Sequence, residues 1–185
     1  MTDNIIKNGR KSLEEHLLGY KENLSQVRAG RANPSLVENI KFDYYGVETP
    51  IRNAATITVP EARLLVIQPW DASQLKEIER AIQASDLGIT PSNDGKVIRL
   101  PFPELNEETR NNLAKEVKQK GEQSKVGVRN QRRDMIDLVK KAEKNKEISE
   151  DERRSLEEDI QELIDEFIKK IDQATQEKEK ELKTV

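Results

Sequence analysis

Residues 101–117 read PFPELNEETRNNLAKEV, and the fold of the chain is decided at this point. Pro101 and Pro103 are the last of seven prolines, all of which lie between residues 34 and 103. A proline in a helix interior costs about 3 kcal/mol, so the proline-free flanks and the proline-rich middle predict two different architectures. The quoted stretch marks the end of an inserted segment and the start of a long helix.

The density of charge changes at the same boundaries. Residues 31–104 include 18 charged side chains in 74, whereas the other 111 residues include 49. The whole chain is 36% charged and 34% hydrophobic, which suits long helices with one buried stripe. The net charge is only −3, so the signs are mixed and disorder is not favoured. We predict one helical domain from residues 1–30 and 105–185, interrupted by a second domain of residues 31–104.

The flanks predict three helices. Asn106 is a suitable N-cap for the second helix, and Ser149 with Glu152 forms a capping box for the third. Apolar residues recur at spacings of three and four, which indicates an elongated three-helix bundle, with an intermolecular coiled coil as the alternative. The stripes are Ile6, Leu13, Leu17, Tyr20, Leu24 and Val27; Leu113, Val117, Val128, Met135, Leu138 and Ala142; and Leu156, Ile160, Leu163, Phe167, Ile171, Ala174 and Leu182.

The insert has the pattern of a small β/α/β domain, which makes the fold class α+β. Gly46 and the triplet Asn93-Asp94-Gly95 are turn signals, and one helix is expected over residues 72–85. The expected strands are residues 40–45, 47–51, 54–59, 64–68, 89–90 and 96–100. The chain crosses between the domains twice, and we predict a hinge at these crossings. The hinge residues are Gly30, Arg31, Pro103 and Glu104.

Residues for catalysis are scarce. The chain has no cysteine, and His16 is its only histidine, so thiol chemistry and a cysteine or histidine metal site are excluded. No glycine-rich phosphate loop occurs. We expect no enzyme activity, no cofactor and no metal. No secretory signal and no apolar run of about 18 residues is present, so we expect a cytoplasmic protein, or one of an organelle matrix, with no membrane association.

The second helix has a basic edge. Residues 110–146 hold 12 basic and 5 acidic residues, whereas residues 147–166 hold 10 acidic and 2 basic ones. At about 100° per residue, the basic side chains of the second helix gather on one face beside its apolar stripe. A solvated face paired with the acidic third helix is one interpretation; a surface for folded RNA is the other, and the crowding of arginines favours it. The predicted RNA-binding residues are Arg28, Arg31, Lys118, Lys125, Arg129, Arg132 and Arg133.

The stretch VRAGRANPSL at residues 27–36 resembles the signature of bacterial ribosome recycling factors. Further stretches follow the same family in order along the whole chain. They are Tyr44-Tyr45-Gly46, Thr49-Pro50, residues 84–88 (ASDLG), 98–101 (IRLP), 125–134 (KVGVRNQRRD) and 147–151 (EISED). Two positions depart from the family pattern: Gly127 stands where Ala is usual, and Gln131 replaces an apolar residue. Glycine weakens a helix interior by about 1 kcal/mol, so we expect local softness there.

The resemblance implies an L-shaped monomer of a three-helix bundle and a β/α/β domain. It also implies a function after translation termination, in which the protein acts with elongation factor G and its GTP hydrolysis to split the ribosome into subunits. By the same resemblance, Arg129 and Arg132 contact large-subunit rRNA, and the supporting contacts are Arg28, Arg31, Lys125 and Arg133. A helical chaperone or adaptor that binds proteins through its stripe is the alternative. Steep salt dependence of binding would distinguish RNA docking from that alternative.

Overall fold

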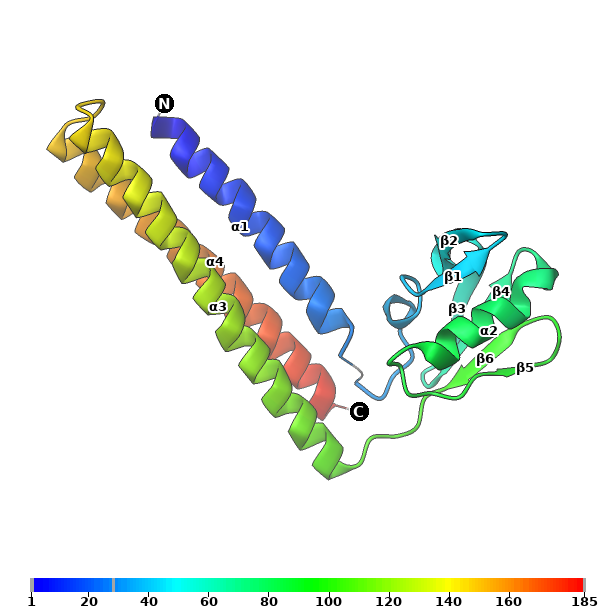
Figure 1. The fold of residues 1–185 in the computed structure, drawn as a ribbon. Helices are drawn as coiled ribbons and strands as arrows, with labels where there is room; N and C mark the ends of the chain where they lie inside the picture. The colour runs from blue at the N-terminus through cyan, green and yellow to red at the C-terminus, as the bar shows by residue number, and fades with distance from the viewer. Residues whose placement is uncertain (1, 28, 185) are drawn as a thin grey trace. The chain divides into compact units, whose positions relative to one another are not determined.

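The computed structural model describes residues 2–27 and 29–184, and these fall into two compact units. One unit contains the chain up to Leu24 together with Asn111–Thr184, and the other is Ser25–Arg110. The first unit is helical and the second holds every strand of the described residues (Figure 1). None of the helices in these residues is long and apolar enough to cross a membrane.

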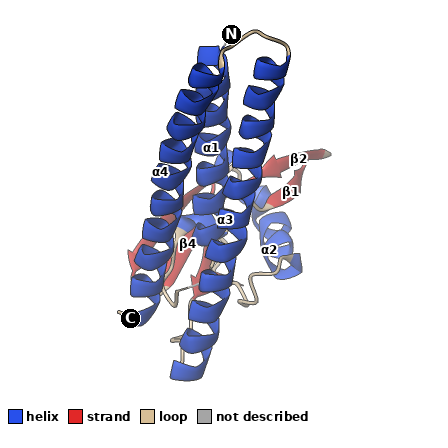
Figure 2. Ribbon diagram, turned by 90° about the vertical axis from the view of Figure 1, so that its left-hand side faces the viewer, coloured by secondary structure: helices blue, strands red, loops and turns tan. Residues whose placement is uncertain are grey.

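The helical unit is built from α1 (Thr2–Ser25), α3 (Glu107–Lys144) and α4 (Glu150–Lys183). The three helices lie side by side along their lengths (Figures 1 and 2). The expected caps are present: Asn106 Oδ1 accepts from the Thr109 amide at 2.7 Å, and Ser149 and Glu152 form a reciprocal capping box. These bonds satisfy amides that the first turn of a helix leaves without partners.

The apolar stripes meet inside this bundle. Leu13 of α1, Val117 of α3 and Phe167 of α4 have no exposed surface, so the stripes are buried within one chain. Leu138 was expected in the core, but it is 53% exposed and Val139 is buried in its place. The reason is helical geometry: Val139 follows Met135 by four residues and lies about 40° from it, whereas Leu138 lies about 60° away on the other side.

The described residues of the second unit form six strands in two antiparallel sheets. The hairpin β1–β2 forms one sheet, and the other has the order β3–β4–β6–β5. The bounds are β1 Lys41–Tyr44, β2 Val47–Pro50, β3 Ala55–Glu61, β4 Leu64–Pro69, β5 Ser92–Asn93 and β6 Ile98–Pro101, with α2 at Leu75–Ala84 and 3-10 turns at Pro34–Leu36, Ile51–Asn53 and Ala72–Gln74. The core of this unit lies between α2 and the strands, where Ile78, Ile67 and Leu100 are fully buried.

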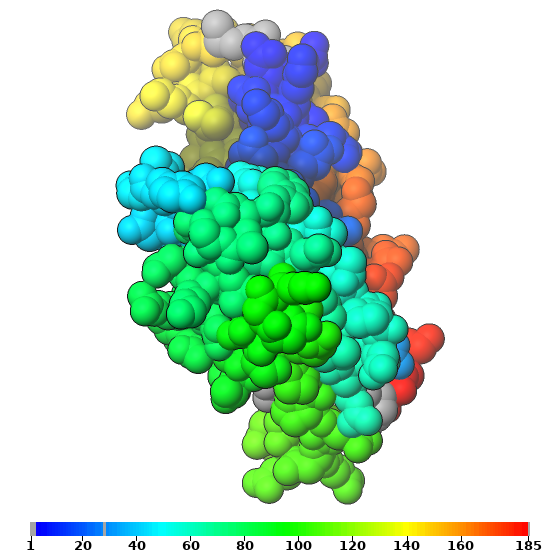
Figure 3. All heavy atoms as spheres, turned by 90° about the vertical axis from the view of Figure 1, so that its right-hand side faces the viewer, coloured from blue at the N-terminus to red at the C-terminus, as the bar shows by residue number. Residues whose placement is uncertain are grey.

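The β1–β2 hairpin follows from its turn. Tyr45 and Gly46 both have positive φ, 48° and 85°, which matches the two-residue turn that joins twisted antiparallel strands. The Gly46 amide donates to Asp43 Oδ1 at 2.6 Å and fixes the turn. In the space-filling view the hairpin is the cyan projection at the margin of its unit (Figure 3).

One expected strand is misplaced in the sequence-based prediction. Residues 89–90 are not a strand; the short strand β5 is Ser92–Asn93, which pairs with β6. Pro91 explains the shift, because it has no amide hydrogen to donate to the ladder and pairing begins only after it. Ile89 is nevertheless buried, so its apolar character reflects packing in the core.

Candidate nucleic-acid interface

The α3 helix positions the basic residues. It is continuous over 38 residues, and Val117, Val128 and Met135 on one side are buried in the bundle. Side chains about 60–160° away around the helix axis from that buried side cannot reach the core. One face of α3 is therefore directed away from the core. We define the basic strip by the residues on this face: Lys118, Lys125, Arg129, Arg132 and Arg133.

Three members of the basic strip are open cations. Lys118, Arg129 and Arg133 are exposed. None of them makes an ion pair or a side-chain hydrogen bond with any residue in the described ranges 2–27 and 29–184. The interpretation of this edge as a face neutralised by acidic α4 does not fit these three, because an ion-paired face would occupy their charged groups. Their charges are available to an external anion.

Lys125 differs from them. Its Nζ lies 2.8 Å from Glu122 Oε1 and 2.9 Å from Asp172 Oδ1, and its side chain is only 14% exposed. The hydrogen bond to Glu122, and after it the one to Asp172, raises the pKa of Lys125, while burial opposes the rise. Lys125 thus ties α3 to α4, and the sequence pattern alone did not distinguish it from the open cations.

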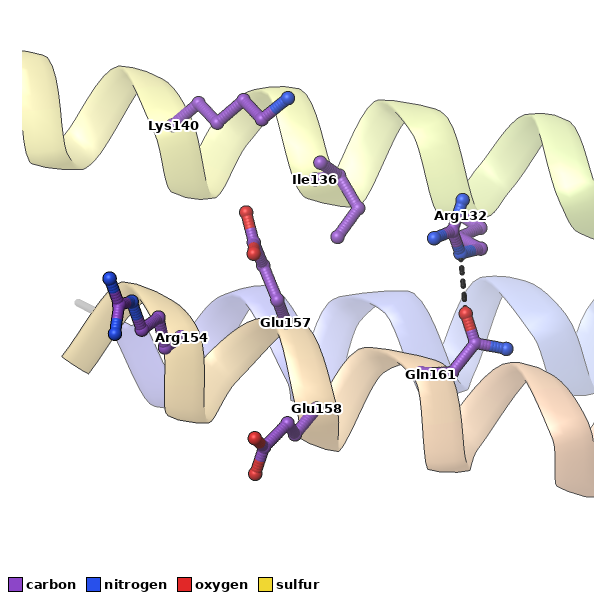
Figure 4. A pocket seen from close by; sticks show the side chains of 7 residues that line it. All are labelled: Arg132, Ile136, Lys140, Arg154, Glu157, Glu158 and Gln161. Atoms are coloured by element: carbon purple, nitrogen blue, oxygen red, sulfur yellow. Dashed lines mark hydrogen bonds between the residues drawn. The ribbon is translucent and has the colours of Figure 1, made fainter. Parts of the chain in front are cut away.

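Arg132 is half-buried at the edge of α4. Its Nε donates to Gln161 Oε1 at 2.8 Å, and Gln161 Nε2 donates to Asp165 Oδ1 at 2.9 Å. Figure 4 shows Arg132 reaching from α3 to Gln161 on α4, with Ile136 directed toward α4 beside it. These residues line an open groove of about 470 Å³ together with Lys140, Arg154, Glu157 and Glu158.

The remaining predicted residues lie away from α3 in the chain. Arg31 is exposed and belongs to the unit Ser25–Arg110. Arg28 lies outside the described residues. Of the predicted hinge residues, Gly30 has a φ of 77°, a conformation that favours glycine, and Glu104 forms a 3.5 Å ion pair with Arg63 of the same unit. The two units divide at Leu24/Ser25 and Arg110/Asn111, six residues from each predicted boundary.

Two residues of this surface were missed from the sequence. Lys140 follows Arg133 by seven residues and lines the same groove as Arg132, so the helical spacing that identified the strip could have found it. Gln161 is on another helix, and only its spacing of four from Asp165 is visible in the sequence. No sequence pattern links it to Arg132.

Within residues 2–27 and 29–184, no group of three or more acidic or histidine side chains could hold a metal ion. His16 is half-buried between helices, with Nε2 3.0 Å from the carbonyl oxygen and 3.1 Å from Oγ of Ser124. Its contacts are those of a residue that joins α1 to α3.

The fold and the basic strip define a class: a two-unit α+β protein with a cationic face along one long helix. Comparison with known proteins gives the family. The family model described as ribosome recycling factor matches residues 20–182. The ribosome-recycling factor of Streptococcus uberis is 56% identical over 185 residues and that of Finegoldia magna 56% over 182, covering 100% and 98% of both chains. The chain belongs to the ribosome recycling factor family.

Solved structures agree with this assignment. A solution structure of a ribosome recycling factor matches with a TM-score of 0.82 and 37% identity, over 100% of this chain and 98% of the other. The Thermus thermophilus factor, represented in models with Escherichia coli elongation factor G bound to the E. coli post-termination complex, matches with a TM-score of 0.68 and 41% identity over 98% of each chain. The family resemblance and the α+β fold predicted from the sequence are confirmed.

Proposed function

We propose that the chain binds the post-termination ribosome through the basic strip and, with elongation factor G and GTP, splits it into subunits. The related T. thermophilus factor has been represented on such a complex together with elongation factor G. The observation on this chain that carries the proposal is the row of unpaired cations on α3, Lys118, Arg129 and Arg133, with Arg132 beside them. Membership of the family confirms the expectation of a non-enzymatic protein. In this proposal, elongation factor G hydrolyses the GTP.

Large-subunit rRNA is the proposed target of the strip. Arginine side chains along one helix face offer positive charge to phosphate oxygens, and a guanidinium can donate two parallel hydrogen bonds to one phosphate. Arg28 and Arg31 are proposed as supporting contacts on the same grounds as before, their place in the family signature. Ribosomes are the substrate, so we infer that the protein acts in the cytoplasm.

The structure does not favour the alternative, a chaperone or adaptor that binds proteins through its apolar stripe. The stripes of α1, α3 and α4 are buried against one another, with residues such as Leu13, Val128 and Ile171 fully covered. The same burial supports a monomer over an intermolecular coiled coil, because within residues 2–27 and 29–184 the stripes are largely covered by one another, with Leu138 as the exposed exception.

We further propose that the two chain crossings act as a hinge, at Gly30-Arg31 and Pro103-Glu104. Units joined by two single crossings move relative to each other by default. In this proposal the basic strip anchors the helical unit while elongation factor G displaces the other one.

The double variant Arg129→Ala with Arg132→Ala tests the target. Both residues are on a helix surface, where alanine is a good helix former, so the fold should persist. Affinity for purified large ribosomal subunits should fall, and the log–log dependence on salt should flatten by about 0.7–0.9 per lost phosphate contact. Sedimentation of post-termination ribosomes with elongation factor G and GTP should show less splitting.

A matched control removes the same charge elsewhere. Lys169 and Lys180 are exposed on α4, and their double replacement by alanine should leave the affinity and the salt dependence nearly unchanged. If the strip variant binds large subunits as tightly as the parent protein, the strip is a solvated face and the proposed target is wrong.

A further inference from the structure

Arg132 is the one residue of the basic strip whose side chain is held through its inner nitrogen. Gln161 Oε1 accepts from Arg132 Nε at 2.8 Å, which leaves the two terminal nitrogens of the guanidinium unused by this bond (Figure 4). These terminal nitrogens form no ion pair within residues 2–27 and 29–184, although Glu157 and Glu158 line the same groove. One edge of the guanidinium is therefore held by Gln161, and the other edge is open to a ligand.

Gln161 is itself oriented. Its Nε2 donates to Asp165 Oδ1 at 2.9 Å, one helical turn further along α4, so its amide is fixed with the oxygen directed at Arg132. A neutral amide oxygen suits this function better than a carboxylate would. It holds the guanidinium by one hydrogen bond without cancelling the positive charge that a phosphate would meet.

We propose that Gln161, oriented by Asp165, is a positioning residue that presents the two terminal nitrogens of Arg132 to one RNA phosphate. The inference rests on the proposed function, because it needs Arg132 to contact RNA. It adds a residue of acidic α4 to a basic strip otherwise built from α3. Arginine has many rotamers, and fixing one of them before binding removes part of the entropy loss that a mobile side chain suffers on contact.

We call the chain of hydrogen bonds from Arg132 through Gln161 to Asp165 the relay. The neighbouring arginines show what the relay changes. Arg129 and Arg133 are exposed and have no such bond with any residue that the structure describes, so they meet RNA as mobile cations. Arg132 differs from them in orientation and not in charge. The relay therefore affects the geometry of one contact and leaves the total charge of the strip the same.

The test is Gln161→Met, which removes the acceptor while keeping the length of the side chain and a good helix former. Affinity for purified large ribosomal subunits should fall roughly three- to tenfold, the range expected for one ordered side chain. The salt dependence should stay as in the parent protein, since no cation is lost, and thermal melting should not change. Gln173→Met is the matched control: Gln173 is exposed on the same helix, and the change should leave affinity unaltered.

A double-mutant cycle separates positioning from any other role of Gln161. In an Arg132→Ala background, Gln161→Met should have no further effect, because the group that it orients is gone. A loss of the same size in both backgrounds overturns the relay, as does parent-like affinity of Gln161→Met when Arg132→Ala weakens binding. If Arg132→Ala itself binds like the parent protein, both the proposed contact of Arg132 with RNA and the relay are wrong. The two outcomes that overturn only the relay leave the proposed function unaffected.

Discussion

Gly127 provides a prediction that opposes simple helix propensity. It lies in the interior of α3, where replacement by alanine would ordinarily stabilise a helix by about 1 kcal/mol. An ideal Cβ built at this position would lie 2.6 Å from Cε1 and 3.1 Å from Nε2 of His16 on α1. Carbon atoms in contact need about 3.5–4.0 Å, so the His16 ring would have to move.

The ring is not free to move without loss. Its Nε2 is placed against the carbonyl oxygen and Oγ of Ser124, and displacement would break a bond worth about 1 kcal/mol. Overpacking at this contact between α1 and α3 costs a further 1 kcal/mol or more, up to about 3. We therefore expect Gly127→Ala to lower the free energy of unfolding by about 1–3 kcal/mol, after its gain in helix propensity is counted.

The assay is urea unfolding followed by the helical signal in circular dichroism, carried out as a cycle with His16→Ala. In the His16→Ala background the space above Gly127 is open, and Gly127→Ala should then stabilise by about 1 kcal/mol. A change of sign between the two backgrounds is the decisive result. If Gly127→Ala stabilises the protein with His16 in place, the glycine is only a soft point in the helix and the packing argument is wrong.

Two further predictions concern the bundle. Val117→Asp places a carboxylate at a position with no exposed surface and should cost about 3 kcal/mol or more, seen as a large fall in melting temperature. The same change at Val126, which is 51% exposed on α3, should have little effect. An unchanged melting temperature for Val117→Asp would contradict the core assignment. Hydrogen bonds from Arg10 and then Lys170 lower the pKa of Glu166 to about 2 from its ordinary 4.5, so the ion pair stabilises the fold above about pH 4.5 and the effect is lost as the pH falls toward 2. Glu166→Gln should therefore destabilise the protein by about 1 kcal/mol at pH 7, a value reduced by solvent screening, and by progressively less below pH 4.5. Glu162→Gln, which changes an exposed side chain, is the control. A pH-independent difference in stability for Glu166→Gln would exclude the linkage.

Much of the fold could be predicted because the signals were local. The capping box at Ser149, the cap at Asn106 and the Gly46 hairpin each depend on residues within four positions of one another, and all are present. The errors arose where a local pattern had two solutions. Leu138 and Val139 are both apolar, and only the place of the neighbouring helices decides which one is buried.

The candidate site was less accessible to sequence reasoning. Helical spacing identifies which basic residues share a face of α3, but it does not show the acceptors on α4. Asp172 beside Lys125 and Gln161 beside Arg132 come from residues 47 and 29 positions further along the chain. The division of the strip into open, paired and oriented cations therefore appears only when the helices are packed.

That division predicts that Lys125 contributes less to RNA binding than its place in the basic strip suggests. A phosphate that approached its Nζ would have to displace Glu122 and Asp172, and both carboxylates would then face the RNA. Lys125→Ala should lower the melting temperature by removing the link between α3 and α4, while the salt dependence of binding to large ribosomal subunits stays close to that of the parent. Arg129→Ala should do the reverse, because Arg129 is exposed and holds no other helix: the melt is unchanged and the log–log slope falls by about 0.7–0.9. If the two variants flatten the salt dependence equally, Lys125 exchanges its carboxylates for phosphate on binding, and its ion pairs in the free protein do not decide its function.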